Sequence, residues 1–133
     1  MKYISLLLPI LLTACTPSSS EDFKREGESI CQELTLDLQK IQTREELLRA
    51  LPRFKKTFNS LVQLMIQAHK YQLRHPEEES FDSSFTTYQT NLELMSQLRR
   101  IYQIEGGQEL IERAEREALI RLDGSCSGLL ESR

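Results

Sequence analysis

The sequence predicts an all-α protein, an antiparallel up-down four-helix bundle. Three observations predict this class. Leu, Glu, Gln and Arg, which favour helices, dominate the composition, and runs of β-branched residues are absent. Apolar residues recur at intervals of three and four in four separate segments, the spacing that lines one face of a helix. The connections between the segments are short, which favours antiparallel neighbours.

Before these segments, the chain opens with a short apolar run that ends in Leu12-Thr13-Ala14-Cys15. Met1-Lys2 gives a positive start and small residues precede the cysteine, which is the layout of a secretory signal and its cleavage site. The layout resembles that of bacterial lipoprotein precursors, with Leu12-Thr13-Ala14-Cys15 as the lipobox. The resemblance implies that residues 1–14 are a cleaved signal peptide. It also implies that Cys15 becomes the first mature residue and carries acyl chains such as palmitate.

Two other interpretations of this N-terminus are an ordinary signal peptide, in which Cys15 is incidental, and a membrane-spanning helix. A span needs about 20 apolar residues, whereas this run is shorter and contains Ser5 and Pro9. Thr16 follows the cysteine in place of the aspartate that retains well-studied Gram-negative lipoproteins at the inner membrane. The resemblance therefore favours a lipid anchor in the outer membrane, with the protein on its periplasmic face.

We expect three parts: the signal peptide at 1–14, the lipidated cysteine with a flexible tether at 15–21, and the helical bundle at 22–133. The tether is short, small and polar, and has nothing to bury. The chain has a formal net charge of −3. This mild acidity excludes a general nucleic-acid-binding protein, which would show a basic excess.

The first helix is expected to begin between Asp22 and Glu28 and to end near Gln42. The apolar residues that share one face of it are Ile30, Leu34, Leu38 and Ile41.

Thr43-Arg44-Glu45-Glu46 predicts a capping box at the start of the second helix. That helix should end near His75, because Pro76 cannot continue it. Pro52 lies inside the helix and predicts a kink or a restart near Leu51.

The third helix should begin after an N-cap at Ser83 or Ser84 and end at Gly106-Gly107. The fourth should end at a C-cap at Gly124, followed by a short tail over 125–133. The apolar faces of these two helices comprise Phe85, Tyr88, Leu92, Met95, Leu98 and Tyr102 in the third, and Leu110, Ile111, Ala114, Ala118 and Leu122 in the fourth.

Without Cys15, the remaining cysteines are Cys31 and Cys126. Oxidising compartments favour the pairing of such thiols. An up-down bundle also returns the end of its fourth helix to the start of its first. We therefore predict a disulfide between Cys31 and Cys126, with two unpaired thiols as the alternative.

No catalytic motif is present, so the sequence predicts neither an enzyme nor a cofactor. His69 and His75 are six residues apart and lie on different faces of a helix, which does not suit a shared metal. The acidic run Glu77-Glu78-Glu79 with Asp82 lacks the glycine turn and spaced ligands of a calcium loop. We expect a solvated acidic loop and no metal site.

Basic residues gather at the end of the predicted bundle that lies farthest from the tether. A solvated outer face is the ordinary interpretation of such a group, and a surface for an acidic partner is the alternative. The residues that could bind a partner there are Arg49, Arg53, Lys55, Lys56, Arg99 and Arg100.

Together these features predict a lipid-anchored envelope lipoprotein that acts as a non-enzymatic protein-interaction or adaptor module. Its partners would be the membrane, through the anchor, and an envelope protein, but no nucleic acid. A pilotin-like role, guiding a secretion-system or outer-membrane component, is a specific version that rests on architecture alone. The alternative is a carrier of a lipid or another apolar ligand in the bundle core.

Overall fold

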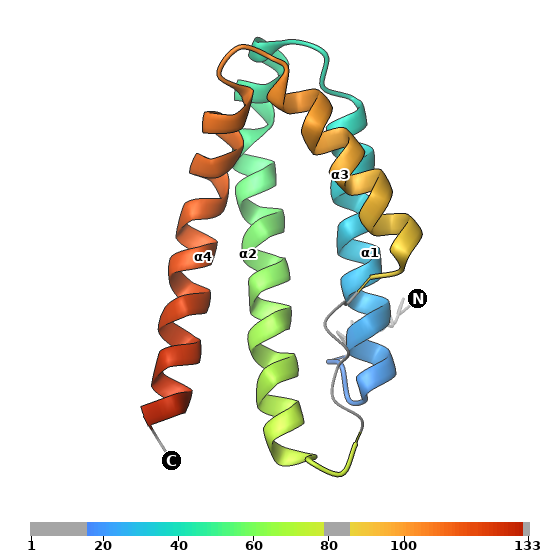
Figure 1. The fold of residues 1–133 in the computed structure, drawn as a ribbon, viewed down its shortest axis with the longest axis vertical. Helices are drawn as coiled ribbons and strands as arrows, with labels where there is room; N and C mark the ends of the chain where they lie inside the picture. Colours follow the sequence, from blue (N-terminus) through green and yellow to red (C-terminus); the bar gives the residue numbers. More distant parts are fainter. Residues whose placement is uncertain (1–15, 79–85, 132–133) are drawn as a thin grey trace, which may run out of the picture.

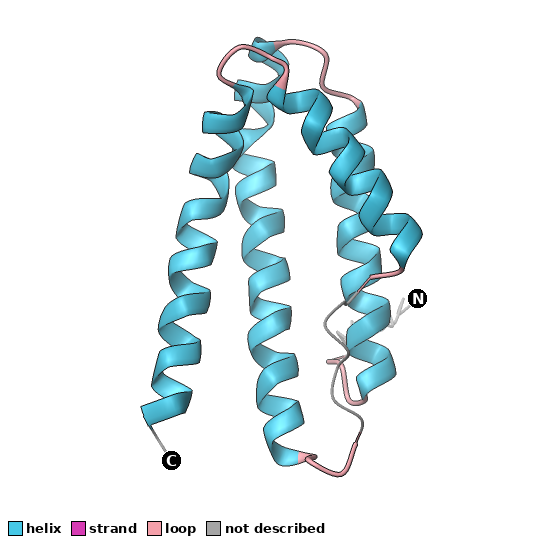
Figure 2. Cartoon of the chain, viewed as in Figure 1, coloured by secondary structure: helices cyan, strands magenta, loops and turns pink. Residues whose placement is uncertain are grey.

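The structure is a computed structural model, which describes residues 16–78 and 86–131. These residues form four helices joined by loops, and the described ranges contain no strand (Figure 2). The all-α bundle predicted from the sequence is confirmed. The lipobox and the predicted N-caps Ser83 and Ser84 lie outside the described residues. The helices are α1 Ser20–Gln39, α2 Arg44–Arg74, α3 Tyr88–Tyr102 and α4 Gly107–Glu131.

The helices alternate in direction, so that α1 and α3 run one way while α2 and α4 run the other (Figure 1). α1 packs against α2 and α3, and α4 packs against the same two helices. The order around the bundle is therefore α1, α2, α4, α3, and α1 lies diagonally opposite α4. Each helix thus has a parallel neighbour, because α1 packs beside α3 and α2 packs beside α4.

The main core lies at the end of the bundle where the short connections meet, and all four helices contribute to it. Burying one large apolar side chain in this core stabilises the folded state by about 1.5–3 kcal/mol. α3 is the shortest helix, so it covers only this end. Farther along, α1 and α2 share one small cluster around Phe23 and Leu64, and α2 and α4 share another around Val62 and Ala118. The largest fully buried side chains are Phe54, Leu34, Leu38, Leu47, Ile101 and Ile111.

Hydroxyl side chains begin the first three helices. The predicted N-cap of α2 is confirmed, because Thr43 accepts the Glu46 N–H. The Glu46 side chain reaches back one residue farther than in a standard capping box and accepts the Gln42 N–H. Ser19 caps α1, so the helix starts at Ser20 and the predicted tether loses its last two residues. The N-cap of α3 is Thr87, later than the predicted position.

The predicted restart near Leu51 is wrong, since α2 continues through Pro52 as one helix. The predicted glycines do separate α3 from α4, although α3 already ends at Tyr102, before the predicted end. Gly106 has a φ of +72°, which favours glycine. At Gly107 a Cβ would lie only 2.0 Å from the Ile101 carbonyl oxygen. Both glycines are therefore required by the turn.

The predicted end of the fourth helix is also wrong, because α4 continues through Gly124 to Glu131. A Cβ at Gly124 would meet nothing within 4 Å. The backbone there is an ordinary helix interior, in which glycine costs about 1 kcal/mol relative to alanine. That cost alone is too small to stop a helix.

Candidate functional site

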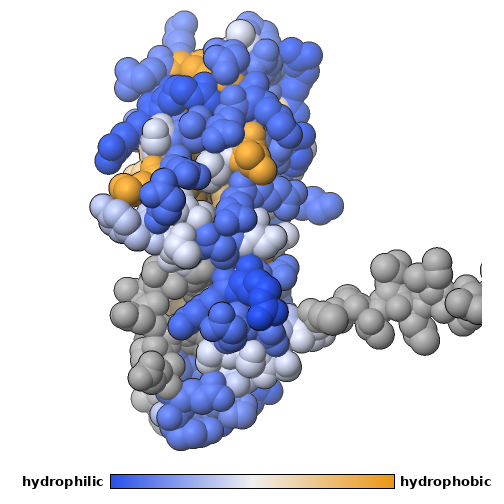
Figure 3. All heavy atoms as spheres, turned by 90° about the vertical axis from the view of Figure 1, so that its right-hand side faces the viewer, coloured by the Kyte–Doolittle hydropathy of each residue, from blue (hydrophilic) through white to orange (hydrophobic). Residues whose placement is uncertain are grey.

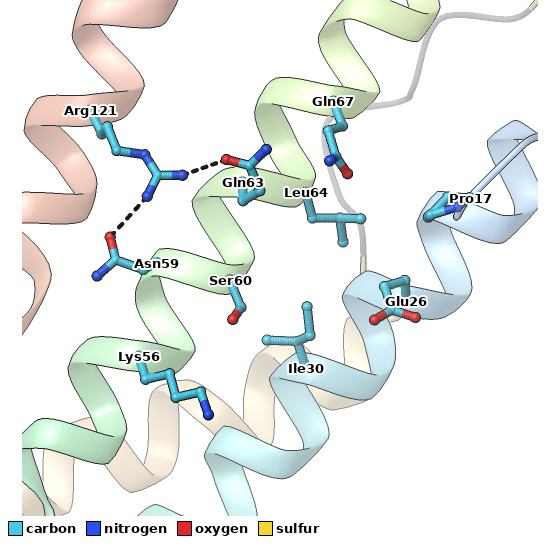
Figure 4. Close-up of a pocket in the computed structure, with 10 residues that line it drawn as sticks. All are labelled: Pro17, Glu26, Ile30, Lys56, Asn59, Ser60, Gln63, Leu64, Gln67 and Arg121. Atoms are coloured by element: carbon cyan, nitrogen blue, oxygen red, sulfur yellow. Dashed lines mark hydrogen bonds between the residues drawn. The ribbon is translucent and has the colours of Figure 1, made fainter. Parts of the chain in front are cut away.

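A surface groove runs between α1 and α2. Its larger part has a volume of about 470 Å³ and reaches from the start of the chain's described part to α4 (Figure 4). A neighbouring part of about 390 Å³ shares Glu26, Ile30, Lys56 and Ser60 with the first. We call the two parts together the α1–α2 groove. Its other lining residues are Pro17, Glu33, Arg53, Thr57, Asn59, Gln63, Leu64, Gln67 and Arg121.

Several polar side chains of α2 line the groove. Ser60, Gln63 and Gln67 recur at intervals of three and four, so they line one side of the helix. The apolar contribution comes from Leu64 and Ile30, which also belong to the small α1–α2 core cluster. The groove therefore combines hydrogen-bonding side chains with an apolar lining.

The two sides of the groove carry opposite charges. α1 contributes Glu26 and Glu33, whereas Arg53 and Lys56 come from α2 and Arg121 from α4. Such a pair of walls suits a polar ligand that carries charges of both signs.

Arg121 is held in place by two amides of α2 (Figure 4). Its Nη2 donates to the Gln63 Oε1 at 2.5 Å and its Nη1 to the Asn59 Oδ1 at 3.5 Å. Arg121 was not predicted from the sequence, since these contacts join residues about sixty positions apart. No local pattern marks it.

The structure separates the six basic residues predicted to bind a partner. Arg53 and Lys56 line the groove, and Arg49, one turn before Arg53, is exposed. The Nε of Arg53 also lies 3.2 Å from the Oδ2 of Asp37, a buried residue of α1. Lys55 instead points to α4, where its Nζ is 2.7 Å from Glu117.

Arg100 contacts the C-terminus of α1. It is half-buried, and its Nη1 and Nη2 donate to the carbonyl oxygens of Ile41 and Leu38 at 2.5 and 2.6 Å. Carbonyls at a helix C-terminus lack partners within the helix and carry partial negative charge. Arg100 thus holds α3 against α1, and it does not line the α1–α2 groove. Arg99 is exposed on α3, away from the groove.

Glu28 of α1 makes the complementary contact at the start of α3. It accepts the Thr87 N–H at 2.8 Å, and the hydroxyls of Thr87 and Thr90 also donate to it. Burial acts to raise the pKa of Glu28, but the hydrogen bonds from Thr90 and Thr87 outweigh it and leave the pKa below its usual value. The carboxylate is therefore held in its charged form. A negative charge is favourable at the N-terminus of a helix.

The predicted disulfide is not formed. Cys31 is buried and Cys126 is exposed, and both are free thiols. The physical reason is the order of the helices, because α1 and α4 do not pack against each other. Burial raises the pKa of the Cys31 thiol, and the nearby Glu28 carboxylate adds to the effect.

The histidines and the acidic run lie at the opposite end of α2 from the main core. His69 is exposed, and the Nδ1 of His75 lies 3.5 Å from the Oε1 of Glu77. Glu78 accepts hydrogen bonds from Ser20 at 2.7 Å and Tyr71 at 2.9 Å, and so ties the start of α1 to the end of α2. Glu79 and Asp82 are outside the described residues. In the ranges that are described, no group of His, Cys, Asp and Glu could hold a metal ion.

Comparisons with protein-family models, with curated proteins and with solved structures find no match to this chain. In the part of the chain that the structure describes, none of the helices has the length and apolar character needed to cross a membrane.

Proposed function

We propose that this chain is a lipid-anchored envelope lipoprotein that acts as a non-enzymatic adaptor, and that the α1–α2 groove receives a segment of its protein partner. The observation that carries the proposal is the make-up of the groove, with walls of opposite charge and side-chain amides between them. The amides of Asn59, Gln63 and Gln67 can bond to a peptide backbone, and the area around Ile30 and Leu64 can accept an apolar side chain. We expect the bound segment to carry charges of both signs.

The position of the groove supports a role close to the membrane. Pro17 lines it and lies two residues after Cys15, the lipidation site implied by the lipobox. Two extended residues span about 7 Å. Ser18 donates to Asp22 through its N–H and its hydroxyl, so the link between the anchor and α1 is short and bonded to the domain. The anchor would therefore raise the local concentration of the groove beside envelope proteins.

A pilotin-like role remains the specific version of this proposal, and it is an analogy of architecture. The alternative, a carrier of an apolar ligand, has less support. Phe54 of α2, one of the apolar residues that would line a cavity in the bundle core, is fully packed within it.

The adaptor proposal can be tested by affinity capture from solubilised envelopes with the anchored protein. We expect one envelope protein to be retained, and Lys56→Glu to reduce its yield by about tenfold through charge repulsion in the groove. The matched control is Lys70→Glu, which reverses an exposed charge on the same helix outside the groove. Equal yields from the two variants would contradict the proposal.

Anchoring is tested separately, by membrane fractionation and intact-mass measurement. The mature wild-type protein should carry acyl chains on Cys15 and sediment with membranes, and a Cys15→Ser chain that lacks residues 1–14 should remain in the soluble fraction. A Cys15→Ser protein that remains in the membrane fraction would contradict the lipid anchor. The groove would then be tested without it.

A further inference from the structure

The α1–α2 groove holds charged side chains that are not paired within the protein. Glu26 and Glu33 of α1 line one side, and we call these two residues the acidic wall. Lys56 of α2 and Arg121 of α4 line the other side, and we call them the basic wall. Among the described residues, Glu26, Glu33 and Lys56 form no ion pair or side-chain hydrogen bond, and Arg121 bonds only to neutral amides. A bound segment could therefore pair with both walls.

Hydrogen-bonding side chains of α2 in the groove are also available to a ligand. Within the described part of the chain, the side chains of Ser60 and Gln67 make no hydrogen bond. Gln63 uses its Oε1 to accept from Arg121, and its amide nitrogen points away from that contact (Figure 4). An α-helix bonds most of its backbone groups internally, whereas an extended chain leaves them for a neighbour. These side chains therefore favour an extended segment.

The spacing of the charges suits an extended segment as well. Glu26 and Glu33 are seven residues apart, so they share one side of α1 at a separation of about 10 Å. Lys56 and Gln63, the residue that holds Arg121, have the same separation along α2. In an extended chain, successive side chains point to opposite sides, and those on one side recur about every 7 Å. Two side chains on each side can therefore reach the two charges of each wall.

The remaining surface of the groove does not distinguish one order of charges from another. Ile30 and Leu64 give it an apolar lining, and both also belong to the small α1–α2 core cluster. On the side of the molecule shown in Figure 3, hydrophobic atoms emerge only in a few separate places within a hydrophilic surface. The choice of a segment would therefore depend on the two charged walls.

We propose that the α1–α2 groove binds its partner segment in an extended conformation. Basic side chains of the segment face the acidic wall, and they alternate along the chain with acidic side chains that face the basic wall. This inference rests on the proposed function, because it specifies the segment that the groove receives. Recognition of an extended peptide through its backbone, with alternate side chains giving the specificity, is a recurring mode of binding.

The test uses the mature chain with Cys15→Ser, which avoids detergent, and two labelled peptides of about eight residues. Both contain equal numbers of lysine and glutamate. In the first peptide the two residues alternate, and in the second the glutamates precede the lysines, an order that favours a helix through pairs four residues apart. By fluorescence anisotropy we expect the alternating peptide to bind about tenfold more tightly than the second peptide.

Loss of the acidic wall should weaken binding of the alternating peptide. We expect Glu26→Gln combined with Glu33→Gln to raise its Kd by about tenfold. The matched control is Glu45→Gln combined with Glu105→Gln, which removes the same charge at exposed positions outside the groove. Circular dichroism should show unchanged helicity in both variants, because all four positions are exposed.

Three results would overturn this inference: no binding of the alternating peptide, equal or tighter binding of the second peptide, or equal effects of the two double variants. None of them would contradict the proposed function. The capture of an envelope protein and its loss with Lys56→Glu do not depend on the conformation of the segment or on the order of its charges. Capture without binding of the alternating peptide would therefore retain the adaptor and reject the extended, alternating segment.

Discussion

The Nη2 of Arg100 in α3 lies 2.6 Å from the Leu38 carbonyl oxygen in the last turn of α1. At the other end of α3, Glu28 of α1 accepts the Thr87 N–H. Parallel neighbouring helices place like ends of their dipoles side by side, which is unfavourable. A cation at the C-terminus of one helix and a carboxylate at the N-terminus of the other offset this repulsion. These two contacts explain how α3 is held parallel to α1.

Removing the guanidinium should destabilise the bundle. Arg100→Ala would leave the Leu38 carbonyl of α1 and the Ile41 carbonyl just after it without their charged donors, and we expect the free energy of unfolding to fall by about 2 kcal/mol. Arg99→Ala is the matched control, since it removes an exposed neighbour and should change stability by less than about 0.5 kcal/mol. Urea denaturation measures both. Similar losses in the two variants would count against the assigned role of Arg100.

The Glu28 contact should make part of the stability depend on pH. Folding lowers the pKa of Glu28 below its ordinary value of 4.5, so the native state binds fewer protons than the unfolded state. The contribution is therefore present above about pH 4.5 and is lost as the pH falls through the lowered pKa. Glu28→Gln should be less stable than the wild type at pH 7. This difference should shrink by pH 3, and a constant difference would refute the assignment.

Substitution by alanine should change the stability of the protein in opposite directions at Gly107 and Gly124. Gly107→Ala forces a Cβ against the Ile101 carbonyl, and we expect a loss of about 2 kcal/mol or more. Gly124→Ala meets open space within α4 and should gain about 0.5–1 kcal/mol. Thermal unfolding of the two variants checks both signs. Destabilisation by Gly124→Ala would mean that α4 does not continue past this position.

The cysteines should react as free thiols at very different rates. Cys126 is exposed and should be alkylated within minutes in the native protein without reductant. Cys31 is buried with a raised pKa, so it should react only on unfolding. Mass spectrometry of the alkylated protein follows each site. If neither thiol reacts in denaturant until a reductant is added, the cysteines are paired and the helix order described above is not the one present in solution.

Local signals in the sequence were sufficient for much of the fold. The Thr43 N-cap, the Gly106-Gly107 break and the apolar faces of the helices depend on residues within a turn or two of one another. The end of the fourth helix was wrongly predicted at Gly124, because a single glycine in the sequence is compatible with both a C-cap and a helix interior. Its surroundings, which the sequence does not contain, decide between the two.

The candidate site was less predictable because it depends on which helices are neighbours. Arg53 and Lys56 belong to the basic group predicted at one end of the bundle, and both line the groove. The same pattern could not tell that Arg100 caps another helix or that Arg121 joins the groove from α4. An up-down bundle can be closed in more than one order, and the order chosen here separates Cys31 from Cys126.

The central claim, that the α1–α2 groove receives a segment of an envelope protein, is tested most directly by photo-crosslinking in the cell. A photoreactive residue at Ser60, inside the groove, should capture one envelope protein, and mass spectrometry should place the crosslink in a segment with charges of both signs. The same residue at Arg116, exposed on α4 outside the groove, should capture little. The same set of crosslinks from both positions, or none from Ser60 in the anchored and folded protein, would contradict the claim.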